Sequence, residues 1–143
     1  MLVTDDVRPT STELVRRRRK LRRSPLRVLL VEDDTLTANA LRRLLEADGL
    51  TVRVADCYKQ AIATASEWFP DVLVCDIDLP GKDGIQVMQC MRQVHPTLRG
   101  IVVSAHTNEH DRKRSRDAGF SDYLNKPIRA EQLVNAIHKV ASQ

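Results

Sequence analysis

The feature that most constrains the fold is an apolar run that ends in a carboxylate. Residues 72–76 read Val-Leu-Val-Cys-Asp, and the turn residues Pro80 and Gly81 follow shortly after. An unbroken apolar run of this length is typical of a strand that is buried on both faces. Asp76 is therefore expected at the carboxyl edge of a sheet, which is the edge where open α/β sheets bind ligands. An isolated Asp at this place would need no explanation beyond turn capping.

Three other apolar runs lead into polar residues in the same way. The run at 29–31 is followed by Glu32 and Asp33, the run at 101–103 by Ser104, and the pair Tyr123-Leu124 by Lys126. Because the carboxyl ends of parallel strands meet at one edge of a sheet, these carboxylates, the hydroxyl and the lysine are expected on the same rim as Asp76.

Strand-like and helical patterns alternate from residue 27 onward. Strand-like runs begin near Arg27, Thr51, Asp71, Gly100 and Ser121, and each is followed by a helical pattern. Five such units with short connections predict one α/β domain, a (βα)5 doubly wound parallel sheet with helices on both faces. The periodicity itself leaves the strand order open.

The helical patterns differ in how many apolar residues they can contribute to a hydrophobic core. In the first, Leu36, Ala40, Leu41, Leu44 and Leu45 are expected to form one apolar face, and in the second Ala61, Ile62, Ala65, Trp68 and Phe69. The fourth pattern, residues 108–118, contains almost no apolar residue. We expect it to be a loosely held helix that ends at Gly119.

Positive charge is concentrated at the N-terminus. Of the 23 Lys and Arg and 19 Asp and Glu, residues 1–26 hold eight basic and three acidic ones, which leaves 15 basic and 16 acidic residues elsewhere. A block of like charges such as 16–23 is usually solvated. We therefore expect residues 1–25 to be a basic arm or linker and residues 26–143 to be the folded domain. The arm has no aromatic residues to stack on bases, so nucleic-acid binding through phosphate contacts is the less favoured alternative.

Several classes of protein are excluded by the same sequence. No apolar run approaches the roughly 18–20 residues that span a bilayer, and the charged N-terminus lacks the apolar core of a signal peptide. We therefore expect a cytoplasmic protein. Cys57, Cys75 and Cys90 form no C-x-x-C pair, which argues against a zinc site or a disulfide framework.

The residues expected on the rim suit metal-assisted phosphoryl chemistry. Hard oxygen ligands of this kind select Mg²⁺ (or Mn²⁺), with Asp33 and Asp76 as direct ligands and Glu32 through water. Beside a metal, Asp76 stays ionised and can act as a nucleophile toward phosphorus. Lys126 supplies a positive charge and Ser104 a hydroxyl donor for the transferring phosphoryl group. For Lys126 alone, a surface salt bridge would be the simpler explanation.

From about Leu26 to the C-terminus, the chain resembles the receiver domain of two-component response regulators. The matching elements occur in the family's order, and they are the acidic pair Glu32-Asp33, Asp76, Ser104 with Ala105, Tyr123 and Lys126-Pro127. The resemblance implies the flavodoxin-like strand order 2-1-3-4-5. It also implies that Asp76 is the phosphoacceptor and that the backbone carbonyl of Asp78 completes the metal site.

The resemblance assigns further roles and partners. Ser104 and Tyr123 correspond to the family's switch residues, while Asp78 and His106 flank the path of the hydrolytic water and are expected to modulate the lifetime of the phosphoryl group. The donor would be a histidine kinase or a histidine phosphotransfer protein. The output would pass to an effector or a second copy, through the face of the fourth helix, fifth strand and fifth helix. Such a protein is a signalling switch that catalyses only its own phosphorylation and dephosphorylation, either as a stand-alone regulator or as the receiver of a hybrid kinase.

The main alternative is a phosphohydrolase of the haloacid-dehalogenase type. Those enzymes also use an apolar strand that ends in Asp-x-Asp, which Asp76-Ile77-Asp78 fits. That family places the motif on its first strand and needs a later acidic pair. Here the pair Glu32-Asp33 comes earlier in the chain, so the receiver prediction is favoured.

Overall fold

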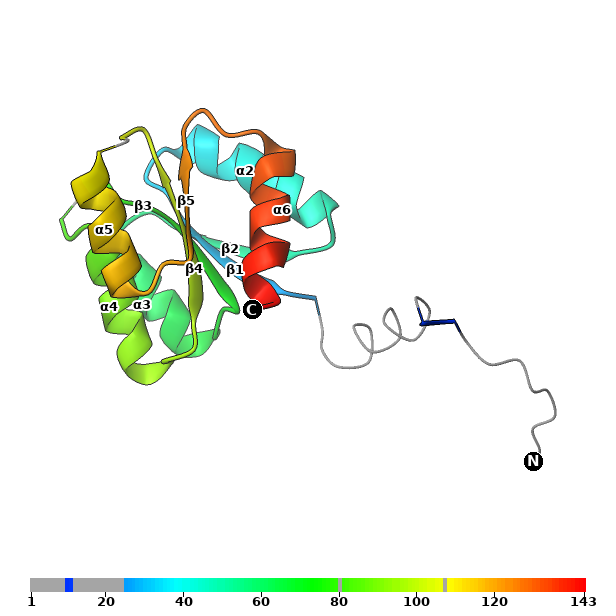
Figure 1. Cartoon of the computed structure of the whole chain (residues 1–143), viewed down its shortest axis with the longest axis horizontal. Coiled ribbons are helices and arrows are strands. Elements are labelled where there is room, and N and C mark those ends of the chain that lie inside the picture. Colours follow the sequence, from blue (N-terminus) through cyan, green and yellow to red (C-terminus); the bar gives the residue numbers. More distant parts are fainter. Residues whose placement is uncertain (1–9, 12–24, 80, 107) are drawn as a thin grey trace.

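Five parallel strands form the centre of the molecule (Figure 1). A computed structural model describes residues 10–11, 25–79, 81–106 and 108–143. The strands are β1 (Arg27–Val31), β2 (Thr51–Ala55), β3 (Val72–Asp76), β4 (Arg99–Ser104) and β5 (Asp122–Asn125). They lie in the order β2-β1-β3-β4-β5, which confirms the predicted doubly wound sheet and the order implied by the resemblance.

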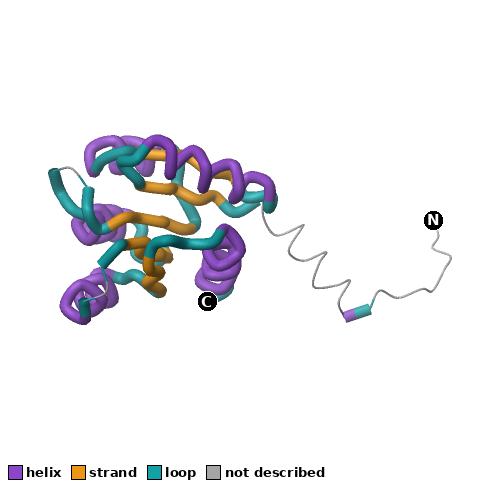
Figure 2. The backbone as a smooth tube through the Cα atoms, turned by 90° about the horizontal axis from the view of Figure 1, so that it is seen from above, coloured by secondary structure: helices purple, strands orange, loops and turns teal. Residues whose placement is uncertain are grey.

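Helices cover both faces of this sheet. They are α2 (Thr35–Ala47), α3 (Tyr58–Glu67), α4 (Gly84–Val94), α5 (Glu109–Ala118) and α6 (Ala130–Ala141). Helices α2 and α6 lie on one face and α3, α4 and α5 on the other, and the view from above shows the strands between them (Figure 2). None of the helices in the described ranges has the length and apolar character that crossing a bilayer requires.

Alternate side chains of the central strands pack into two separate hydrophobic cores, one on each face of the sheet. Leu29 and Leu73 pack toward α3 and α4 with Met88, whereas Val28 and Val74 pack toward α2 and α6. All five residues of β3 are buried, as expected for a strand covered on both faces. Truncating a fully buried leucine in such a core costs roughly 2–5 kcal/mol of folding stability. The rim residues are therefore attached to well-packed strands.

The predicted apolar face of α2 is wrong in part. Leu45 is fully buried, but Leu36 is 81% exposed and Leu44 is 48% exposed. Residues nine positions apart lie on opposite sides of a helix, so Leu36 and Leu45 cannot both face the sheet. Packing of Leu45 fixes the rotation of α2, and Leu36 and Ala40 are turned to solvent.

Phe69 also departs from its expected place. Helix α3 ends at Glu67, and Trp68 follows with extended backbone angles of φ −136° and ψ 95°. Successive side chains of extended backbone point in opposite directions. Trp68 is therefore buried, whereas Phe69 is 56% exposed and its ring lies edge-on to the ring of His95.

The polar fourth segment does form a helix. Asn108 caps α5 by accepting a hydrogen bond from the Asp111 amide at 2.8 Å, and Gly119 ends the helix with a φ of 112° that favours glycine. Within α5, all of which the structure describes, Ser115 alone is buried. The domain boundary expected near residue 25 is not tested, because most of residues 1–25 lie outside the described ranges.

Candidate functional site

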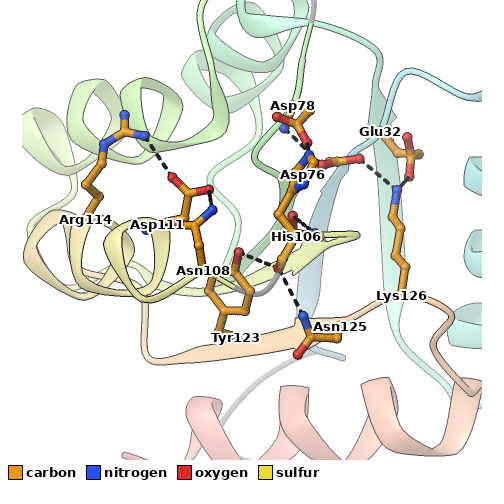
Figure 3. Close-up of polar contacts among 11 residues, drawn as sticks. Glu32, Asp76, Asp78, His106, Asn108, Asp111, Arg114, Tyr123, Asn125 and Lys126 are labelled. Atoms are coloured by element: carbon orange, nitrogen blue, oxygen red, sulfur yellow. Dashed lines mark hydrogen bonds and ion pairs between the residues drawn. The ribbon is translucent and has the colours of Figure 1, made fainter.

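The polar residues predicted for one rim do come from the carboxyl ends of four strands. Glu32 follows β1, Asp76 ends β3, Ser104 ends β4 and Lys126 follows β5. The pairing of β1 with β3, β3 with β4 and β4 with β5 sets these strand ends side by side. A close-up shows most of these side chains and their polar contacts (Figure 3).

Three carboxylates form a compact acidic cluster on this rim. One carboxylate oxygen each of Glu32, Asp33 and Asp76 lies within 4.8 Å of the others. Glu32 and Asp76 are buried, at 4% and 8% exposure, while Asp33 is exposed. Charges buried in this way require partners, because removing them from water is costly.

Lys126 is the partner of both buried carboxylates. Its Nζ atom donates to Asp76 Oδ2 at 2.7 Å and to Glu32 Oε1 at 2.8 Å. Burial opposes the charge of Lys126, but these two hydrogen bonds outweigh it and raise the pKa of the ammonium. Counted formally, the three carboxylates of this cluster and the Lys126 ammonium leave two negative charges, which is the charge that one divalent cation balances.

Backbone amides hold the remaining carboxylate oxygens in place. The amide of Asp78 donates to Asp76 Oδ1 at 3.0 Å, and the amide of Asp34 donates to Glu32 Oε2 at 3.1 Å. Asp34 itself caps α2 by accepting from the Thr37 amide at 3.1 Å and from the Thr37 hydroxyl. The hydrogen bonds from Thr37 lower the pKa of Asp34. Asp34 thus positions the helix beside the cluster, a capping role that an acidic residue ahead of a helical pattern can signal.

The start of α4 packs directly against the backbone of Asp76. A Cβ atom added at Gly84 would collide with the Asp76 carbonyl oxygen and with Sγ of Cys75. Close backbone approach explains why glycine occupies this position. Cys75 is fully buried beneath the site, and burial raises the pKa of its thiol well above the usual range.

His106 connects the two loops that flank Asp76. Its backbone amide donates to Ser104 Oγ at 3.0 Å, and its Nε2 atom lies 2.8 Å from Asp78 Oδ2. Ser104 is fully buried, whereas the His106 and Asp78 side chains are more than half exposed. The imidazole and the Asp78 carboxylate therefore lie at the solvent side of the rim.

The carbonyl oxygen of His106 accepts two side-chain hydrogen bonds from β5. The Tyr123 hydroxyl donates at 2.9 Å and the Asn125 Nδ2 atom at 3.0 Å (Figure 3). Asn125 accepts in turn from Nη2 of Arg112 at 2.9 Å, and the Arg112 guanidinium stands 4.7 Å from the centre of the Tyr123 ring. Sequence reasoning missed Asn125 and this role of Arg112, since neither residue carries a motif of its own.

The donor set fits the predicted divalent cation. Hard carboxylate oxygens clustered at this spacing are the ligands that Mg²⁺ selects, and it usually keeps several waters. Asp33 is exposed, whereas both oxygens of Glu32 and both oxygens of Asp76 already accept hydrogen bonds.

The chain matches known proteins over most of its length. The family model described as "Response regulator receiver domain" matches residues 28–138. The transcriptional regulatory protein TrcR of Mycobacterium tuberculosis is 36% identical over 111 residues, which are 78% of this chain and 43% of TrcR. The KDP operon transcriptional regulatory protein KdpE of Escherichia coli is 37% identical over 106 residues, which are 74% of this chain and 47% of KdpE. The chain therefore spans less than half the length of these two relatives.

Solved structures agree with the sequence match. A CheY-like response regulator receiver domain protein from Methanospirillum hungatei superposes with a TM-score of 0.80 at 25% identity, and the alignment covers 83% of this chain and 95% of that one. These matches give no support to the haloacid-dehalogenase alternative. With its strand order, its acidic rim and a family match that covers most of its residues, this chain belongs to the response regulator receiver domains of two-component signalling.

Proposed function

We propose that Asp76 accepts a phosphoryl group from a phosphohistidine or a small acyl phosphate. The observation that carries the proposal is the placement of one ammonium, that of Lys126, on both Asp76 and Glu32 within an acidic cluster. A carboxylate oxygen of Asp76 attacks phosphorus, the bond from phosphorus to the donor breaks, and the donor leaves as histidine or carboxylate. Asp33 and Asp76, the Asp78 backbone carbonyl and, through water, Glu32 would hold Mg²⁺ or Mn²⁺, which when bound neutralises charge on the phosphoryl group.

Lys126 and Ser104 contact the transferred group in this proposal. The ammonium already points at Asp76 Oδ2, so it is positioned to pair with a phosphoryl oxygen. The Ser104 oxygen accepts from the His106 amide, which leaves its own proton free to be donated to that group. Drawing Ser104 toward Asp76 opens space for the Tyr123 ring, and phosphorylation shifts a pre-existing equilibrium between two ring positions.

The output face in this proposal is formed by α5, β5 and α6. Helix α5 presents four basic residues, Arg112, Lys113, Arg114 and Arg116. A cavity of about 170 Å³ lies between α5 and β5, lined by Arg112, Arg116, Asp122 and Tyr123 among others. Lys113, Arg114 and Arg116 pair with acidic side chains of the domain itself. In this proposal, an acidic side chain from an effector or from a second copy of the chain exchanges with those partners.

The proposal is tested by treating the protein with a phosphodonor and then measuring its intact mass. Treatment with acetyl phosphate and Mg²⁺ is expected to add one labile phosphate to the chain and none to the Asp76→Asn variant. Chelation of the metal is expected to abolish the addition. Labelling that persists in Asp76→Asn would reject Asp76 as the acceptor.

A further inference from the structure

The loop between β3 and α4 is closed against the backbone of Asp76. It spans residues 77–83, and in the proposed function the backbone carbonyl of Asp78 is one of the groups that hold the divalent cation. The amide of Gly84, the first residue of α4, donates to the Ile77 carbonyl at 3.0 Å. A Cβ atom at Gly84 would collide with the Asp76 carbonyl oxygen. The position of the first turn of α4 therefore constrains the path of the loop.

Asp83 fixes this first turn through a capping box. Its Oδ1 atom accepts from the Gln86 amide at 3.0 Å, and Gln86 Oε1 accepts in return from the Asp83 amide at 2.9 Å. These two bonds satisfy backbone groups at the start of the helix. They use only one oxygen of the Asp83 carboxylate, and the other oxygen makes a contact outside α4.

That second oxygen binds Arg114 of α5. Nη2 of Arg114 lies 2.9 Å from Asp83 Oδ2, and its Nη1 lies 3.4 Å from Asp111 Oδ1 (Figure 3). The side chains of Arg114 and Asp83 are 38% and 31% exposed. In the ion pair of His106 with Asp78, which also involves this loop, they are 56% and 58% exposed. Arg114 therefore makes the more shielded of these two contacts, and it acts on the residue that caps α4.

We propose that Arg114 is a positioning residue of the metal site, which by holding Asp83 keeps the loop in the path that presents the Asp78 carbonyl to the cation. The inference rests on the proposed function. It adds a residue from α5 whose ion pairs are made with Asp83 and Asp111 rather than with a proposed metal ligand. Without this contact the loop populates other paths, and the apparent affinity for the cation falls with the population of the competent one.

Charge alone predicts a different pattern of effects. Removing the positive charge of Arg114 would leave its surroundings more negative and would tighten the binding of a cation, whereas removing the negative charge of Asp83 would weaken it. If Arg114 acts through position, both changes weaken binding. The sign of the Arg114 effect therefore separates the two explanations.

The experiment measures Mn²⁺ affinity by titration calorimetry in Arg114→Gln, Asp83→Asn and the double variant. Asparagine caps helices as well as aspartate does, so Asp83→Asn keeps an acceptor for the Gln86 amide and removes the charge that Arg114 binds. Each single variant is expected to bind Mn²⁺ about two- to fivefold more weakly, which is the range for loss of a partly exposed ion pair. The double variant is expected to bind about as weakly as either single variant, because both remove the same contact. Arg42→Gln, which loses an exposed pair with Glu46 on α2, is the control and is expected to bind as the unaltered chain does.

Linkage provides a second readout. If the pair of Arg114 and Asp83 favours metal binding, bound metal must strengthen that pair by the same factor. Saturating Mg²⁺ is therefore expected to increase the amide-exchange protection of residues 109–118 in the unaltered chain, and to increase it less in Arg114→Gln. Arg114→Lys keeps a charge near Asp83 without the planar fork, and it is expected to restore part of the affinity.

Unchanged or tighter Mn²⁺ binding by Arg114→Gln overturns the proposal. So does a double variant whose loss of affinity equals the product of the two single losses, since the two residues would then act independently. Failure of the unaltered chain to bind Mn²⁺ at all counts against the proposed metal site instead, so the two failures are distinguishable.

Discussion

The ammonium of Lys126 lies 2.7 Å from Oδ2 of Asp76, where a divalent cation would compete with it for the same carboxylate. Lys126→Met removes that competing charge and leaves the acidic cluster intact. We expect its Mg²⁺ affinity to rise about tenfold, since unit charges a few ångströms apart interact by more than ~1 kcal/mol near a protein surface. Phosphorylation by acetyl phosphate is expected to fall in the same variant. Titration with Mn²⁺ measures the first effect and intact mass the second, and weaker metal binding would contradict the competition.

The same lysine predicts how stability changes at high pH. Its two hydrogen bonds raise the pKa of Lys126 from its ordinary value of 10.5 in the folded chain. Stability from a raised pKa is fully present below the unfolded value and is lost as the pH rises through the folded one. The free energy of unfolding, measured with urea, is therefore expected to fall more between pH 10 and roughly pH 12 for the unaltered chain than for Lys126→Met. Equal slopes would show that the ion pair adds no stability.

Substituting Gly84 by alanine is expected to change stability in the opposite direction from the usual one in a helix. Alanine normally stabilises a helix relative to glycine, by roughly 0.5–1 kcal/mol in helix interiors. At Gly84 the added Cβ meets the Asp76 backbone, so Gly84→Ala is expected to destabilise the fold by about 1–3 kcal/mol. Urea unfolding measures the change. A gain in stability would mean that α4 can move away from Asp76 at little cost.

The exposed leucine of α2 predicts where the phosphodonor binds. Leu36 is 81% exposed, two residues after the capping Asp34 and close in sequence to the acidic cluster. Under the proposed function, a protein that brings a phosphohistidine to Asp76 is expected to contact this end of α2. Leu36→Glu is expected to slow transfer from a phosphohistidine protein at least tenfold while leaving transfer from acetyl phosphate unchanged. Val94→Glu is the control, because Val94 is similarly exposed, at 78%, at the far end of α4; equal slowing by both variants would reject the assignment.

The pair formed by His106 and Asp78 predicts an effect on the lifetime of the phosphoryl group. Both side chains stand at the solvent side of Asp76, with Nε2 and Oδ2 2.8 Å apart. The resemblance implies that these two side chains flank the path of the attacking water. Asp78→Asn and His106→Ala remove the carboxylate and the imidazole, so both are expected to change the dephosphorylation rate. Metal affinity is expected to stay nearly constant. Decay of the phosphorylated protein over time measures the rate, with His95→Ala as the control, and identical decay in all variants would contradict this role.

The sequence was most informative about the central strands and about the polar residues at their carboxyl ends. A run such as residues 72–76 has few structural solutions, because only a doubly covered strand buries every one of its side chains. The carboxyl ends of such strands then bring Glu32, Asp76 and Lys126 together without any knowledge of the contacts. The confirmed fold and the composition of the rim follow from this.

Two kinds of feature could not be read from the sequence. The rotation of α2 depends on which leucine the sheet accepts, and apolar residues at 36, 41, 44 and 45 are compatible with more than one rotation. The contacts of Arg112 with Asn125 join residues 13 positions apart, and no pattern of residue types specifies which arginine of a basic helix turns inward. Tertiary packing decides both.

The polar attachment of α5 has a thermodynamic consequence. Heat capacity changes when apolar surface enters or leaves water, and within α5 Ala118 is the residue that packs against the core. Displacing this helix exchanges hydrogen bonds and ion pairs for water but transfers little apolar area. If the proposed switch repositions α5, the equilibrium is therefore expected to depend on ionic strength, because charged groups make much of its attachment.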